Sequence, residues 1–163
     1  ELNKKKKIAL HILTDLEYYK YMGRYGHQRT SVLTSKLSCK VYLHEWNEKT
    51  CSDIINRCDL ALIPIPLNDP LAVGKPENKL LLFWRMGLPV VVSATPAYAR
   101  AMQKCGQSMA CRTKSEWMET LIKYMDDKDA RHEAGERGRV FSESHYGEED
   151  LLDRWDDVLR SII

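Results

Sequence analysis

The sequence predicts an α/β fold in which parallel strands alternate with helices. Short apolar runs recur along the chain at residues 7–15, 39–46, 59–67, 88–93 and 107–112. Segments with helical apolar spacing separate them, which is typical of βαβ units, a parallel sheet and helices on both of its faces. The runs at 59–67 and 88–93 are apolar at consecutive positions, as in central strands. We therefore expect Val90, Val91 and Val92 to be nearly inaccessible.

Local signals predict where the helices begin and end. Thr95 followed by Pro96, with Gly106 ten residues on, is the usual asymmetry of a helix start and stop. Thr113 with Glu116 three residues later predicts a capping box.

The remaining segments are assigned from spacing and composition. Thr50 is expected to cap a helix over residues 50–58. Residues 16–37 are aromatic and basic, and we expect a loop followed by a helix there. Two further helical segments are expected at 129–147 and 148–163.

Size and composition fit one ordinary globular domain. The chain has 163 residues and a formal net charge of +2, and we assign residues 1–163 to a single domain. No apolar run approaches the roughly 18 residues that a membrane-spanning helix needs. The N-terminus has lysines but no cleavable apolar stretch after them. We expect a cytoplasmic protein.

The N-terminal quarter is basic. Residues 1–40 hold nine Lys or Arg and three Asp or Glu, a net charge of +6. Such a region could attract phosphate, nucleic acid or an anionic membrane surface. We favour the simpler interpretation, in which residues 4–7 are a solvated lead-in to the first strand, and we expect no nucleic-acid partner.

Cysteine and histidine spacing indicates no metal site or disulfide framework. The five cysteines include no Cys-x-x-Cys pair, so we interpret them as reduced, mostly buried thiols. The five histidines show no metal-ligand spacing. We expect His11 to be packed within a strand, the other histidines to lie on the surface or in loops, and Trp84, Trp117 and Trp155 to lie in the core.

A charged cluster precedes the apolar part of the fourth predicted helix. Lys75, Glu77, Asn78 and Lys79 lie after the third strand, at a helix start. Helices begin beyond the carboxyl ends of parallel strands, where ligands bind, and a helix start favours an anion. A bound phosphate would explain why a lysine, Lys79, lies at a helix start. Asn78 could form a hydrogen bond with a sugar hydroxyl or a base. Alternatively, both lysines are solvated and Glu77 neutralises them.

The order of motifs resembles one enzyme family. The stretch "NKLLLFWRMGLPVVVS" (residues 78–93) resembles the core motif of the C-terminal, nucleotide-sugar donor-binding domain of GT-B glycosyltransferases of the group 1, or family 4-like, type. The preceding "CSDIINRCDLALIPI" and the final "GERGRVFSESHYGEEDLLDRWDDVL" are similar to the flanking parts of that domain. The resemblance covers residues 40–163.

The resemblance implies a Rossmann-like three-layer sandwich, the C-terminal half of a GT-B fold. It implies that Lys79 reaches the donor's pyrophosphate with Asn78 beside it, that Glu77 and Lys75 line the same site, and that Trp46 stacks on the base. Core packing is the alternative for Trp46. The implied enzyme is a glycosyltransferase that needs no metal or other cofactor and binds a nucleotide-diphosphate sugar. Its catalytic residues are not assigned.

The implied enzyme has two domains, so this chain is expected to be a fragment that is inactive without its N-terminal domain. Peripheral association of the intact enzyme with a membrane is left open.

Two positions depart from the family pattern. Leu82 and Gly74 stand where the family usually has the acidic residues that hold the ribose. The alternative function is therefore a non-catalytic nucleotide-binding or interaction module whose site has decayed. A third alternative, a receiver-like or flavodoxin-like domain, fits Asp15 after the first strand, but an acidic cluster is missing.

Overall fold

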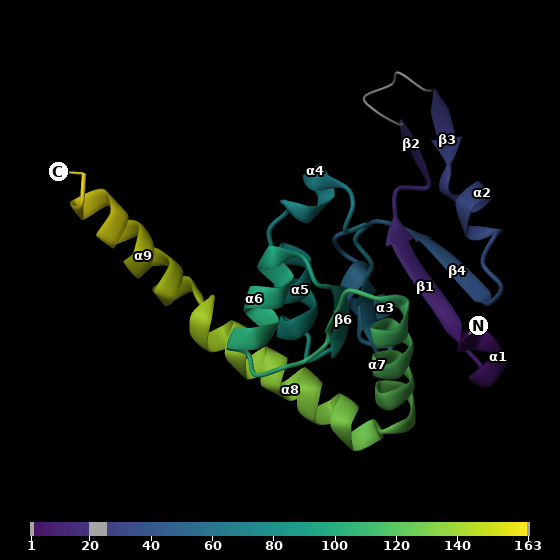
Figure 1. Ribbon diagram of the computed structural model, residues 1–163. Helices are drawn as coiled ribbons and strands as arrows, with labels where there is room; N and C mark the ends of the chain where they lie inside the picture. Colours follow the sequence, from purple (N-terminus) through teal and green to yellow (C-terminus); the bar gives the residue numbers. More distant parts are fainter. Residues whose placement is uncertain (1, 20–25, 163) are drawn as a thin grey trace. The chain divides into compact units, whose positions relative to one another are not determined.

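The computed structural model describes residues 2–19 and 26–162, which form two compact units (Figure 1). The first unit is Glu1–Arg57 and the second is Cys58–Ile163. The assignment of the whole chain to one domain stays a prediction.

The first unit contains a pair of parallel strands and a hairpin. Strand β1 pairs in parallel with β4, and β2 pairs with β3 in antiparallel fashion. The elements, in order, are α1 (Leu2–Lys5), β1 (Ala9–Thr14), β2 (Glu17–Tyr19), β3 (His27–Arg29), α2 (Thr30–Thr34), β4 (Lys40–Glu45) and α3 (Cys51–Ile55). The strands expected at 7–15 and 39–46 are confirmed.

The hairpin corrects the loop expected after the first strand. Opposite charges face each other across it, because Glu17 accepts from Arg29 at 3.3 Å and lies 2.8 Å from Nε2 of His27. Tyr18 donates to Gln28 on the other strand. Such cross-strand pairs stabilise a hairpin, and helical spacing does not reveal them. Residues 20–25 lie outside the described part of the chain.

The second unit is built on a three-stranded parallel sheet with the order β5-β6-β7. Helices α5, α6 and α7 all pack against β6; Figure 1 shows α5 and α6 on one side of it and α7 on the other. The elements are β5 (Ala61–Ile63), α4 (Pro70–Val73), α5 (Asn78–Arg85), β6 (Val90–Ser93), α6 (Pro96–Lys104), β7 (Ala110–Cys111), α7 (Lys114–Asp126), α8 (Lys128–His145) and α9 (Glu148–Arg160).

The fold class is therefore α/β with short parallel sheets, as predicted. The described strands form three separate sheets rather than the one sheet expected from the sequence. The three-layer Rossmann-like arrangement stays a prediction.

Strand β6 lies at the centre of the core of this unit. Val90, Val91 and Val92 are fully buried, which confirms the expectation for these three residues. Leu80 and Trp84 of α5 are also fully buried, so one face of that helix faces the core. The polar residues at the start of α5, Asn78 and Lys79, are exposed.

Close packing joins α5 to α8. A Cβ on Gly135 would lie 3.0 Å from the carbonyl carbon of Gly87 and 3.2 Å from Cδ of Pro89. Gly87 itself has φ +68°, a conformation that favours glycine and ends α5 after Met86. A side chain at 135 would therefore push α8 away from this turn.

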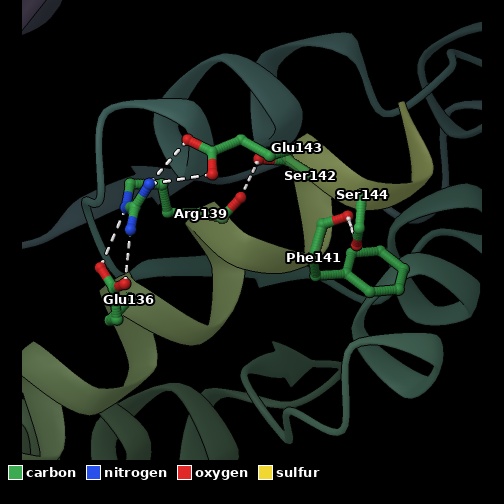
Figure 2. Close-up of polar contacts among 6 residues, drawn as sticks. All are labelled: Glu136, Arg139, Phe141, Ser142, Glu143 and Ser144. Carbon is green, nitrogen blue, oxygen red and sulfur yellow. Dashed lines mark hydrogen bonds and ion pairs between the residues drawn. The ribbon is translucent and has the colours of Figure 1, made fainter. Parts of the chain in front are cut away.

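Charged pairs along α8 offset the poor helix propensity of its two glycines. Arg139 donates to Glu136 at 2.6 Å and to both carboxylate oxygens of Glu143 at 2.7 and 2.9 Å (Figure 2). These contacts hold the pKa of Arg139 above its usual range and lower that of Glu136. Ser142 and Ser144 donate back to the carbonyls of Arg139 and Phe141.

Helix α9 buries none of its residues. Figure 1 shows it in yellow, continuing beyond the end of α8. The core position expected for Trp155 is wrong, because its side chain is 57% exposed. Helical periodicity identifies an apolar stripe but does not show whether another element covers it. Trp84 is in the core as expected, and Trp117 is half-buried.

Most of the predicted helix caps are confirmed. Thr95 accepts from the N–H of Tyr98, and Thr113 accepts from that of Glu116. Gly106 ends α6 with φ +68°. Thr50 precedes α3 but its side chain makes no cap bond, because its backbone is already helical there.

The cysteines of the described residues form no disulfide. All five cysteines are free, and Cys51, Cys105 and Cys111 are buried. In that same part of the chain, no helix combines the length and apolarity that crossing a bilayer requires.

Candidate functional site

The candidate site lies where α5 begins. In a parallel sheet the helices that follow successive strands begin at the same edge, beyond the strands' carboxyl ends. Helix α5 follows β5 through a connection that contains α4, and α6 follows β6. The hydroxyl of Ser93, at the end of β6, accepts from the N–H of Ile65 at 2.8 Å and so ties the connection after β5 to the neighbouring strand.

The first turn of α5 is not capped by its own N-cap residue. Glu77 occupies that position with φ −78° and ψ 13°, and its side chain makes no cap bond. By contrast, side chains cap α4, α6, α7 and α8, from Asp69, Thr95, Thr113 and Asp127. The N–H groups at the start of α5 are therefore more open to an external acceptor than those of these neighbouring helices.

Glu77 is turned toward the rest of the unit. Its side chain is 14% exposed, its Oε1 accepts from the hydroxyl of Tyr146 at 3.3 Å, and it lies 3.9 Å from the guanidinium of Arg100. Burial raises the pKa of the Tyr146 and Tyr98 phenols, and the negative charge of Glu77 raises each of them further. Glu77 therefore holds the end of α8 against the start of α5.

The two lysines remain available for a ligand. Lys75 and Lys79 are exposed, and neither takes part in an ion pair within residues 2–19 and 26–162. Local neutralisation by Glu77, the alternative considered from the sequence, is not seen, because the ion pair of Glu77 is with Arg100. Lys79 thus lies in the first turn of a helix whose dipole disfavours a cation, and no described carboxylate forms an ion pair with it.

A shallow cavity of about 390 Å³ lies next to the helix start. It is lined by Asn78, Leu81, Leu82, Arg85, Tyr146, Asp150, Leu151 and Arg154. Three of these residues are leucines, and the polar lining comprises an amide, a phenol, a carboxylate and two guanidinium side chains. Lys79 is not among its lining residues, so the two neighbours Asn78 and Lys79 face different surroundings.

The C-terminal part of the chain supplies polar residues that the sequence analysis did not assign. Arg85 donates to the carbonyl of Tyr146, and Arg154 donates to Asp150 and to the carbonyl of His145. The Arg154 guanidinium also lies 5.6 Å from the centre of the Tyr146 ring. Arg85 is seven residues after Asn78, so helical periodicity places both on one face and could have identified it.

The structure brings together some of the expected site residues. Asn78 lines the cavity and Glu77 reaches it through Tyr146, whereas Lys75 and Lys79 are exposed and do not line it. Trp46 belongs to the first unit, and core packing of Trp46 is wrong because its side chain is 48% exposed.

The two positions that depart from the family pattern have different surroundings. Leu82 lies on the cavity wall, half-buried. Gly74 ends α4 in a right-handed helical conformation.

Comparison of the chain with protein-family models, with curated proteins and with solved structures found no match. The chemistry of the site therefore rests on its own residues. An uncapped helix start, an unpaired lysine and a neighbouring cavity with an amide on its wall suit a ligand that is anionic at one end and partly apolar at the other.

Proposed function

We propose that the chain is the donor-binding domain of a glycosyltransferase with a GT-B fold, and that it binds a nucleotide-diphosphate sugar at the start of α5. The observation that carries this proposal is Lys79, an unpaired cation in the uncapped first turn of a helix at the carboxyl edge of a parallel sheet. The resemblance of residues 78–93 to the family's core motif supports the same position.

The diphosphate is assigned to the helix start. Lys79 contributes a point charge, and the open N–H groups of the first turn contribute hydrogen bonds. Lys75, exposed in the preceding connection, adds a second positive charge. During transfer, the bond from the sugar's anomeric carbon to the diphosphate breaks, and the same positive groups stabilise the charge that develops on the leaving diphosphate.

The nucleoside is assigned to the neighbouring cavity. Its leucines offer an apolar surface, and Asn78 can both donate to and accept from a sugar hydroxyl or a base. Glu77 takes a structural role in this arrangement, because Tyr146 and Arg100 already engage its carboxylate. Trp46 remains a proposal for base stacking.

The acceptor site and the catalytic residues are assigned to an N-terminal domain of the same enzyme, which lies outside this chain. The chain alone should bind the donor without turning it over. We place the enzyme in the cytoplasm, with no nucleic-acid partner, and peripheral membrane association of the intact enzyme stays open.

The second candidate is a non-catalytic module of the same fold. Leu82 favours it, because an apolar side chain on the cavity wall cannot bind the ribose hydroxyls as a carboxylate would. A module whose site has decayed should bind a nucleoside diphosphate only weakly or not at all, and it should not transfer a sugar.

Calorimetry on the chain and its Lys79→Ala variant tests the proposal, with UDP, GDP, ADP and pyrophosphate as ligands. Loss of one charge-assisted contact, worth about 1.5–3 kcal/mol, should weaken binding about tenfold or more. Fold stability should change little, because Lys79 is exposed and adds nothing favourable to the helix dipole. Lys104→Ala is the matched control, because it removes a lysine from the last turn of a different helix, α6. No binding at millimolar ligand would favour the decayed module, and unchanged binding by Lys79→Ala would show that the phosphate lies elsewhere.

A further inference from the structure

Two histidines from distant parts of the sequence meet on the exposed face of the first unit's parallel strand pair. In the register of β1 and β4, His11 lies opposite Tyr42 and Leu13 lies opposite His44. Side chains alternate along a strand, so positions 11, 42 and 44 share one face. His11 and Tyr42 are exposed and His44 is half-buried, so solvent reaches this face. The packed position expected for His11 is therefore wrong.

The facing nitrogen atoms of the two imidazole rings are within hydrogen-bond distance. Nδ1 of His11 lies 3.0 Å from Nε2 of His44, the ring planes differ by 8°, and the ring centres are 5.2 Å apart. These three values describe rings that lie edge to edge in nearly one plane, with both nitrogens between the two centres. One ring must donate its N–H to the lone pair of the other.

We propose that His11 and His44 form a two-imidazole binding site for a divalent late first-row transition-metal ion, with Cu²⁺ bound most tightly. Neutral imidazole is a common protein ligand for zinc, copper and nickel, and Cu²⁺ has the highest affinity of the divalent series. Two metal–nitrogen bonds of about 2.0–2.1 Å at the roughly 90° angle between neighbouring ligands of a tetragonal Cu²⁺ ion separate the nitrogens by about 2.9 Å. The present separation is within a few tenths of an ångström of that value.

Metal binding replaces the hydrogen bond between the rings. Both facing nitrogens must carry a free lone pair, so the hydrogen on the donor ring moves through solvent to that ring's other nitrogen. Each ring then turns so that its lone pair points to the ion. Two metal–nitrogen bonds form and two water ligands leave the hydrated ion, while each ring stays neutral.

The surroundings define an open, exchangeable site. The Tyr42 ring stacks on His11 with centres 4.7 Å apart, and the Lys40 ammonium lies 4.8 Å from the centre of the Tyr42 ring. No group of three or more His, Cys, Asp or Glu side chains suited to a metal exists among the residues that the structure describes. The ion therefore has two protein ligands, and water fills its remaining positions. Strand register, rather than short spacing, joins these residues 33 apart, so no sequence motif indicates the pair.

Titration of the whole chain with CuSO₄ in a non-coordinating buffer at neutral pH tests the proposal. Calorimetry should detect one site, and the EPR spectrum of the bound Cu²⁺ should show coupling to two nitrogens. His11→Ala and His44→Ala should each weaken this site at least tenfold and remove the two-nitrogen signal. His132→Ala, which removes an exposed histidine of α8, is the matched control and should leave binding unchanged.

Circular dichroism of each variant shows whether it is folded. If His44→Ala does not fold, His11→Ala and His11→Gln decide the question, because position 11 is exposed. Absence of a site in the parent below millimolar Cu²⁺ would overturn the proposal. So would binding in His11→Ala that equals binding in the parent.

Discussion

Gly138 of α8 lies so close to the indole ring of Trp84 in α5 that a Cβ at position 138 would stand 2.7 Å from Cγ and 2.8 Å from Nε1 of that ring. Trp84 is fully buried, so its ring cannot move aside into solvent. The absence of a side chain at 138 thus lets α8 approach α5, and α5 carries the candidate phosphate-binding residues at its other end.

Gly138→Ala should therefore destabilise the fold, although alanine has the higher helix propensity. Overpacking of a filled core costs about 1–3 kcal/mol. Gly74→Ala is the matched control, because Gly74 has φ −76° and a Cβ there would meet only the carbonyl oxygen of Pro70 at 3.4 Å. Urea unfolding should show a clear loss for Gly138→Ala and little change for Gly74→Ala. Equal stability of the two variants would contradict the close packing.

Val91→Ala should cost about 1–3 kcal/mol, because it removes buried methyl groups and leaves a cavity in the centre of the sheet. Val91 is fully buried, whereas Val140 of α8 is 51% exposed. Val140→Ala removes the same atoms from the surface and should change the free energy of unfolding by less than about 0.5 kcal/mol. Denaturant unfolding of both variants measures the difference. Similar losses at the two positions would place the core elsewhere.

Glu116→Gln should reduce stability at neutral pH and have less effect in acid. The backbone N–H of Arg112 donates to Glu116 at 2.6 Å and lowers the carboxyl pKa, with a smaller contribution from Thr113. A lowered folded-state pKa stabilises the fold above the unfolded-state pKa, which is about 4.3, and this stability is lost as pH falls through the folded-state value.

Thermal unfolding of the parent and Glu116→Gln at several pH values between 7 and 2 measures this effect. The difference in Tm should be largest near neutrality and should disappear at the acid end. Glu119→Gln, a substitution of an exposed carboxylate in the same helix, controls for the loss of one negative charge. A pH-independent difference would show that Glu116 acts through something other than its charge.

Much of the second unit follows from local sequence signals. The helix starts at Thr95 and Thr113 depend on neighbours within a few residues, and the consecutive buried valines of β6 need only a short apolar run. The first unit was harder to predict. Its hairpin depends on pairs across strands such as Glu17 with Arg29, and the meeting of His11 with His44 depends on register.

The candidate site was predictable only in part, for a similar reason. Lys75, Asn78 and Lys79 are close in sequence, and their helix-start position is visible from the chain alone. Tyr146 reaches Glu77 across 69 residues, and Arg154 lies near Asn78 only because α8 and α9 follow a path that no short motif encodes. Trp155 shows the limit of periodicity, since its pattern fits a core face that the described structure leaves exposed.

Leu82→Glu should give the site a preference for nucleosides. In the parent, UDP should bind only modestly better than pyrophosphate, because the Leu82 side chain on the cavity wall cannot bind ribose. A carboxylate there would lie in the cavity that Arg85 and Arg154 also line, and it could accept hydrogen bonds from the ribose hydroxyls. Hydrogen bonds to a charged group contribute about 1.5–3 kcal/mol, so the affinity for UDP should rise tenfold or more relative to that for pyrophosphate.

Leu81→Glu adds the same charge to the neighbouring wall position and is the control. Calorimetry with both ligands decides the outcome, and an equal gain in the two variants would mean that position 82 has no special relation to the ribose.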